Sequence, residues 1–214
     1  MHPQLSKAAA AALLSLGLFG CARPGDIQTG GILASYTACP PLAIAAPTGD
    51  VTLFNPAASR DASAIDVVAQ ITNVRGTCND AGEFIVTEVT FDVQAQRRDG
   101  RGARDVVLPY YAAVVQGGTN IVAKRVSRLG LRFEEGQIRA GTSGRATTQV
   151  LRSAATLPED IRRQITRERR AGDPNAAVDP MADPAVRAAV ERARFEVLIG
   201  FELDPDQLRY NATR

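Results

Sequence analysis

The sequence of 214 residues has a single histidine, His2, and no tryptophan. With no histidine beyond position 2, we expect no catalytic triad, metal site or general base built on that residue. Lysine is nearly as scarce, because Lys7 and Lys124 are the only two among 25 basic residues. The 23 acidic residues almost balance the basic ones and leave a formal net charge of +2. This composition argues against a nucleic-acid partner.

The first 21 residues have the pattern of a targeting signal. Lys7 precedes the apolar run Ala8–Phe19, whose dozen or so residues match the length of a signal-peptide core. A membrane-spanning helix needs about 20 apolar residues, and the segment 23–26, Arg-Pro-Gly-Asp, interrupts the run before that length is reached. The run ends in Leu18-Phe19-Gly20-Cys21, which resembles the lipobox of bacterial lipoproteins.

That resemblance implies that residues 1–20 are removed and that the thiol of Cys21 carries a diacylglyceryl group. Two or three acyl chains at Cys21 would hold the protein in a bilayer, with residues 21–36 as a tether and the domain in the periplasm. Ala22, rather than an aspartate, follows the cysteine, and by the same resemblance this favours the outer membrane. The alternative is an ordinary secretory signal that is cut near Gly20, with Cys21 incidental.

With Cys21 acylated, two cysteines are left, Cys39 and Cys78. In an oxidising compartment an even number of remaining cysteines favours a disulfide, and two separate buried thiols are the alternative. Two cysteines without histidine are too few for a zinc site, and the sequence contains no Cys-X-X-Cys redox motif. We expect no metal and no cofactor.

Alternation of apolar and polar residues predicts strands along most of the remaining chain, most clearly at Val89–Ala95 and Phe195–Leu203. Other strands are expected at 41–46, 51–54, 65–72, 105–115, 121–126, 129–133 and 145–153. We expect turns or loops at Gly76–Gly82, Arg97–Arg104 and Gly136–Gly144, and an irregularity near Ser127. Pro109 predicts an edge strand or a bulge. Strands at this spacing predict a predominantly all-β domain over 37–214, an antiparallel immunoglobulin-like β-sandwich.

Before the last strand the pattern becomes helical over residues 158–193. Pro158 stands where a helix would begin, and Glu159 and Asp160 suit its first turn. This helix is expected to reach about Arg170 and to end at Gly172. A second helix is expected at 185–194, so that both form a helical insertion before the last strand.

The segment FEVLIGFELDPDQLRYN, residues 195–211, resembles the ending of a group of small, uncharacterised proteobacterial envelope lipoproteins. Cys39-Pro40, Cys78 and the run Leu108-Pro109-Tyr110-Tyr111 match other features of that group. The resemblance covers residues 36 to 211. It implies an envelope lipoprotein with a β-rich domain, and it implies no activity.

Five clustered arginines are the candidate anion-binding residues: Arg162, Arg163, Arg167, Arg169 and Arg170. Arginine matches phosphate oxygens on lipid headgroups or lipopolysaccharide, whereas nearby Glu159 and Asp160 favour a merely solvated helix face.

Three other sequence features have a binding or catalytic interpretation beside a structural one. Tyr110 and Tyr111 should point to opposite sides of a strand, one into the core and one outward. The acidic group Glu202, Asp204 and Asp206 is interpreted as the cap of a terminal helical turn rather than as a carboxylate site. The run 141–144, GTSG, is interpreted as a turn, because it lacks the lysine of a phosphate-binding loop.

The preferred hypothesis is a non-catalytic binding or scaffold lipoprotein that contacts an envelope protein through an exposed sheet edge or the helical insertion. The alternative is an accessory protein that recognises anionic lipid or cell-wall glycan through the arginine-rich helix. An enzyme would need a carboxylate or hydroxyl site that the sequence does not reveal.

Overall fold

The computed structural model describes residues 38–167 and 178–213. Cys21, Arg169 and Arg170 lie outside these ranges, so their predicted roles are not addressed by the fold. The strands belong to one compact unit, which comprises Ser35–Ile165 and Asp179–Arg214. All structural statements below concern the described residues of this unit, apart from Arg167.

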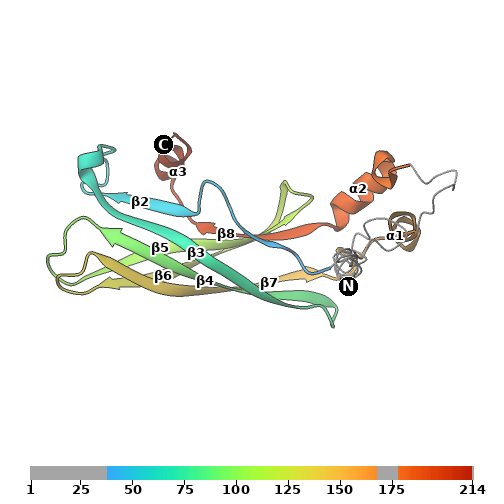
Figure 1. Cartoon of the computed structure of the whole chain (residues 1–214), viewed down its shortest axis with the longest axis horizontal. Helices are drawn as coiled ribbons and strands as arrows, with labels where there is room; N and C mark the ends of the chain where they lie inside the picture. The colour runs from blue at the N-terminus through green and yellow to red at the C-terminus, as the bar shows by residue number, and fades with distance from the viewer. Residues whose placement is uncertain (1–37, 168–177, 214) are drawn as a thin grey trace, which may run out of the picture. The chain divides into compact units, whose positions relative to one another are not determined.

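Eight strands form two four-stranded sheets that enclose the core (Figure 1). Sheet A has the order β1 (Leu42–Ile44), β8 (Phe195–Phe201), β5 (Arg104–Gln116) and β6 (Asn120–Phe133). Sheet B has the order β2 (Asp50–Phe54), β3 (Ile65–Asn79), β4 (Phe84–Arg97) and β7 (Arg139–Leu151). Every pairing is antiparallel except that of β1 with β8, which is parallel. The prediction of a predominantly all-β sandwich is confirmed.

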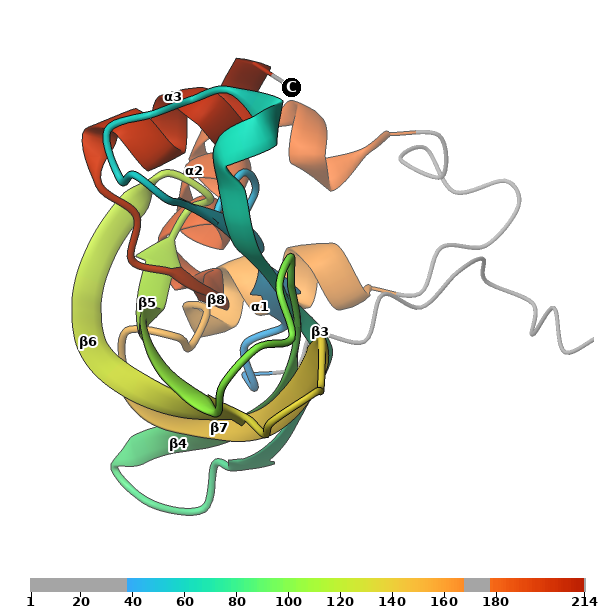
Figure 2. The ribbon, with the colours of Figure 1, turned by 90° about the vertical axis from the view of Figure 1, so that its left-hand side faces the viewer.

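Side chains of alternate residues on both sheets fill the core, as the sequence pattern predicts. From sheet B, Val89, Phe91 and Val93 on β4 are each 0–1% exposed. From sheet A, Ile199 and Phe201 on β8 are buried to the same degree. Figure 2 shows how β6 curves towards β7, so that the sheets approach each other on that side without pairing.

Two segments that were expected to be loops because of their glycines belong in part to strands, and only residues 80–82 and 136–138 of them are turns or loops. β3 continues through Gly76 and Cys78 to Asn79, and β7 already begins at Arg139. Gly144 lies opposite Phe91, and the Phe91 ring occupies the space that a Cβ atom at Gly144 would need. Glycine in these strands therefore marks close packing rather than a turn.

The expectation for Pro109 was wrong, because β5 lies between β8 and β6 and its register shift occurs at Val114/Val115. Pro109 is tolerated because β8 pairing ends next to it, at Phe201 opposite Tyr110. The Pro109 carbonyl still accepts a hydrogen bond from Glu202 N at 2.9 Å, and only the return donor is missing. The break expected near Ser127 is also absent, since β6 runs continuously from Asn120 to Phe133.

The segment between β7 and β8 contains α1 (Glu159–Thr166), a 3₁₀ turn at Pro180–Ala182 and α2 (Pro184–Ala193). α1 begins directly after Pro158 as expected, but it ends at Thr166 and not near Arg170. α2 begins as expected within one residue, and the Asp183 side chain caps it by accepting from Ala185 N at 2.8 Å. α2 packs beside β5, where Gln116 Nε2 donates to Arg192 O at 2.7 Å.

The chain closes with α3 (Pro205–Thr213), which packs on β2. Asp204 caps α3, because its Oδ1 accepts from Asp206 N and Gln207 N at 2.9 and 2.8 Å. Gln207 Oε1 in turn accepts from Asp204 N at 3.0 Å, which completes a reciprocal capping box. The cap interpretation of this acidic segment is confirmed.

A buried arginine ties the β4–β5 and β6–β7 connections together. Arg97 is 2% exposed, and its guanidinium lies 5.2 Å from the centre of the Phe133 ring. Its nitrogens donate to four backbone carbonyls at 2.7–3.0 Å, those of Gly100, Gly102, Glu134 and Gln137. This end of the sandwich is therefore held by one side chain that the sequence pattern had placed at the start of a loop.

Candidate functional site

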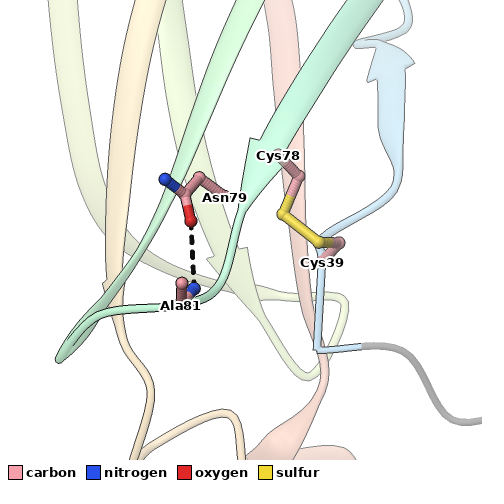
Figure 3. Close-up of a disulfide and its surroundings, with 4 residues drawn as sticks. All are labelled: Cys39, Cys78, Asn79 and Ala81. Carbon is pink, nitrogen blue, oxygen red and sulfur yellow. Dashed lines mark hydrogen bonds between the residues drawn. A yellow bond between two sulfur atoms is a disulfide. The ribbon is translucent and has the colours of Figure 1, made fainter.

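The end of the sandwich opposite Arg97 contains the disulfide. Cys39 and Cys78 are bonded, with their Cα atoms 6.0 Å apart (Figure 3). Cys78 lies near the end of β3, opposite Thr87 of β4, so the bond fixes the start of the described chain to sheet B. The predicted disulfide is confirmed, and the alternative of two separate thiols is excluded.

The arginines of α1 are close to acidic partners. Arg162 forms an ion pair with Glu159, and Arg163 Nε lies 3.9 Å from the other carboxylate oxygen of the same residue. Asp160 adds a second acidic residue to this helix. Arg167 follows the helix and is exposed. Within α1 itself, two cations therefore lie beside two anions, so the helix has no excess of positive charge, and Arg167 adds one cation just beyond its end.

The outward faces of the two sheets differ in chemistry. On β3, β4 and β7 of sheet B the outward positions are almost all polar, and these exposed residues include Gln70, Arg75, Glu88, Thr90, Gln94, Gln96, Ser143, Arg145 and Thr147. The large exposed apolar residues on these strands are Val68 and, at one end, the facing pair Phe84 and Leu151.

Asp92, on this outward face of sheet B, is held by two side-chain hydrogen bonds. Its two carboxylate oxygens accept from Asn73 Nδ2 at 2.5 Å and from Ser143 Oγ at 2.8 Å. Asn73 reaches it from a left-handed backbone conformation, φ 55°, at the irregularity in β3. These hydrogen bonds, first that from Asn73 and then that from Ser143, lower the pKa of Asp92. The arrangement links three strands, and it supplies no nucleophile paired with a base.

The outward face of sheet A carries large apolar side chains among charged ones, since Lys124 and Arg128 lie on either side of Val126 on β6. Val107 on β5 is 60% exposed, and Val126 and Ile121 on β6 are 50% and 60% exposed. Pro109 is exposed between them on β5. We call Val107, Pro109, Ile121 and Val126 the apolar face. Among the described strands β6 pairs only with β5, so the apolar face adjoins a free strand edge.

The two tyrosines of β5 diverge as predicted. Tyr110 points into the core, where its hydroxyl donates to Arg145 O at 2.7 Å and its ring meets Phe91 edge-on at 5.1 Å. Tyr111 is half-buried and points outward beside Val126, its partner in the register. Tyr111 is therefore the tyrosine available to a surface, and Tyr110 is part of the core.

A small polar cluster borders the apolar face. Lys124 Nζ lies 2.7 Å from Glu202 Oε2 and 4.5 Å from the centre of the Tyr111 ring. The Tyr111 hydroxyl lies 2.9 Å from Thr48 Oγ1, which itself donates to Ala45 O at 2.8 Å. A cavity of about 160 Å³ lies among these four side chains, Leu203 and Leu208. Each polar group already has a partner, so the cluster supports the face and is not poised for chemistry.

The acidic residues near the carboxyl end do not converge. Glu202 pairs with Lys124, Asp204 caps α3, and Asp206 pairs with Arg209 at 3.0 Å. Within residues 38–167 and 178–213, no group of three or more His, Cys, Asp or Glu residues could hold a metal ion. The run GTSG lies inside β7, so its interpretation as a turn was wrong.

Comparison of the chain with protein-family models, with curated proteins and with solved structures finds no significant match. None of the helices in the described ranges has the length and apolarity needed to cross a membrane. The sequence analysis missed the apolar face, because alternation shows that one side of a strand is apolar and not which strands lie side by side. The available signal was that apolar residues occur at adjacent positions, Val106 with Val107 and Ile121 with Val122, in the strands expected at 105–115 and 121–126.

Proposed function

We propose that this protein is a membrane-anchored envelope lipoprotein that acts as a non-catalytic binding or scaffold module. The observation that carries the proposal is the apolar face, where three large aliphatic side chains are 50–60% exposed on neighbouring strands. Lys124 and Arg128 lie between these side chains on the same face, and exposed apolar groups bordered by polar residues mark protein contact sites. The expected partner is an envelope protein with a complementary apolar surface.

The free edge of β6 adds to the binding capacity of this face. Residues 120–126 are exposed at every position, which means that both sides of the strand are accessible there. An unpaired strand edge can accept a strand from a partner, while pockets beside it select side chains. Lys124 and Arg125 lie on this segment and, as charged edge residues, disfavour indiscriminate pairing.

The proposed membrane anchor and the proposed location in the envelope both depend on Cys21. Acylation there, after removal of residues 1–20, would attach the domain to a bilayer from the periplasmic side, with the outer membrane as the favoured location. The sandwich is proposed to be of the immunoglobulin-like type in the packing of its two sheets, with residues 158–193 as a helical insertion before β8.

The alternative, recognition of anionic lipid or cell-wall glycan by the arginine cluster, is less favoured by the geometry. Glu159 contacts both Arg162 and Arg163, which reduces the net charge that α1 offers to an anion. Under this alternative, reversing the charges of Arg163 and Arg167 would abolish binding to anionic vesicles.

Site-specific photocrosslinking in cells tests the main proposal. A photoreactive residue at Val126 of the full chain should give a discrete adduct with an envelope protein. The matched control is Thr147, which likewise lies exposed on the outer face of an edge strand, β7, but on the polar sheet B. Val107 provides a second position should substitution of Val126 disturb the fold. Adducts from neither face, or equal adducts from both, would contradict the proposal.

A further inference from the structure

We infer that the disulfide end of the sandwich faces the bilayer and that the cross-strand pair Phe84–Leu151 contacts phospholipid there. The inference rests on the proposed acylation of Cys21. It assigns a second, direct membrane contact to the folded domain itself, in addition to the acyl anchor.

The first step is the place where the chain enters the domain. The Cys39–Cys78 disulfide attaches the entering chain near the end of β3 (Figure 3). Cys78 is opposite Thr87, and Phe84 precedes Thr87 by three positions on β4, closer to the turn that joins the two strands. Phe84 in turn lies opposite Leu151, the last residue of β7. The pair and the entry point therefore share one end of sheet B.

The second step is reach. Between Cys21 and Cys39 lie 17 residues, which span at most about 60 Å even when fully extended. Ile138, at the other end of the 13-residue strand β7, is about 44 Å further along the sandwich. An acylated chain brings the disulfide end to the bilayer directly, whereas the Ile138 end could reach it only if the tether ran back along the sandwich.

The third step is the chemistry of the pair. Phe84 is 43% exposed and Leu151 is 45% exposed, although they face each other across two strands. The connecting turn that precedes Phe84 is held in place, because Arg152 N donates to Glu83 O at 2.9 Å and Arg152 Nε donates to Gly82 O at 2.7 Å. An exposed aromatic and an aliphatic side chain on a rigid support suit the boundary between headgroups and acyl chains.

The fourth step selects the type of lipid. Asp80 and Glu83 are exposed in the turn beside the pair, whereas Arg152 is half-buried and donates to Gly82 O, so the exposed charge of this turn is negative and would be repelled by an anionic surface. The contact is therefore apolar and does not depend on anionic lipid. The anchor keeps the domain at a high local concentration at the surface, so two side chains are enough to bias its orientation.

The chain has no tryptophan, so Phe84→Trp introduces a unique fluorophore. The full acylated variant is reconstituted into phosphatidylcholine vesicles, with and without brominated acyl chains. We expect its emission to shift to the blue and to be quenched about twofold by the brominated lipid. The same result is expected when phosphatidylglycerol is added. Ile138→Trp, at a residue that is 46% exposed at the opposite end, is the matched control and should remain unquenched. Leu151→Trp is a second reporter should Phe84→Trp disturb the fold.

The outcomes separate this inference from the proposed function. Co-flotation with vesicles, together with quenching only at the disulfide end, supports both the inference and the proposed anchor. Co-flotation with no quenching, or with equal quenching at both ends, overturns the inference and leaves the anchor intact. Quenching that requires phosphatidylglycerol overturns the apolar contact. Loss of co-flotation overturns the proposed anchor, and the inference falls with it.

Discussion

At the scale of single residues, the least expected feature is the burial of Arg97. Its guanidinium donates to four backbone carbonyls at 2.7–3.0 Å, and none of these acceptors is a carboxylate. Alternation along β4 places position 97 on the inner face with Val93 and Ala95. From the sequence, a charged residue at that position predicts the start of a loop, because a buried charge without partners is costly. The carbonyls that make the burial of Arg97 tolerable come from the β4–β5 and β6–β7 connections, which meet only in the folded domain.

Arg97→Met should destabilise the domain by about 3 kcal/mol, since it leaves several carbonyls without their donor. Chemical denaturation followed by circular dichroism measures the change. Arg98→Met is the control, because its exposed neighbouring side chain should alter the free energy of unfolding by less than about 0.5 kcal/mol. Equal effects of the two substitutions would show that the carbonyl contacts contribute little.

Asp92 gives the domain a pH-dependent contribution to stability. Hydrogen bonds from Asn73 and Ser143 lower its pKa in the folded state. A lowered folded pKa contributes stability that is present above the unfolded value, about 3.9, and that is lost as the pH falls through the folded value. Asp92→Asn should therefore lower the melting temperature at neutral pH.

The difference in melting temperature between the wild type and Asp92→Asn should shrink once the pH drops below about 4. Thermal unfolding over a pH series measures it, with Ser143→Ala as a variant that removes one hydrogen bond and keeps the charge. A difference that stays constant across the acid range would mean that the substitution acts through packing and not through the carboxylate.

At the scale of elements, alternation predicted β4 and β8 well and located α2 and the cap of α3. The strand residues that were misassigned to loops share one cause, which is that glycine was interpreted as a turn. Gly76 and Gly144 lie in strands because neighbouring side chains, Leu42 and the ring of Phe91, occupy the space beside them. The assignment of strands to sheets also lay beyond the sequence, because it depends on contacts between distant segments, such as β8 between β1 and β5.

The disulfide joins two elements that are 39 residues apart in the sequence. In the chain-entropy model, closing a loop of this length stabilises the fold by up to about 4 kcal/mol. Cys39→Ser combined with Cys78→Ser should lower the free energy of unfolding by about 2–4 kcal/mol. Denaturation of the wild type with and without a reductant provides the comparison. A reductant that changes the double variant as much as the wild type would exclude the bond as the cause.

At the scale of the whole molecule, the two sheets face solvent with different chemistry. The outer face of sheet B is polar along most of its length, whereas the outer face of sheet A carries Val107, Ile121 and Val126. A protein that acts alone as a monomer is expected to have polar residues on both outer faces. The asymmetry is therefore our main reason to propose a binding role.

Cys21→Ser should release the protein from membranes. Each buried methylene of an acyl chain contributes about 0.8 kcal/mol to membrane binding, so two or three chains make binding effectively permanent and their removal abolishes it. Partition between detergent and aqueous phases, together with the mass of the mature chain, measures the effect. A wild-type chain that keeps residues 1–20, or that has an unmodified thiol at Cys21, would contradict the anchor.

The position of β8 determines when the domain can be completed. β8 spans residues 195–201 and lies between β1 and β5, so sheet A has an open gap until residue 201 has been made. All of sheet B, by contrast, is available once residue 151 has emerged. A nascent chain would hold half a core with its apolar interior uncovered, a state prone to aggregation. Productive folding must therefore wait until β8 has been made, and a chaperone that delays collapse until then should raise the yield.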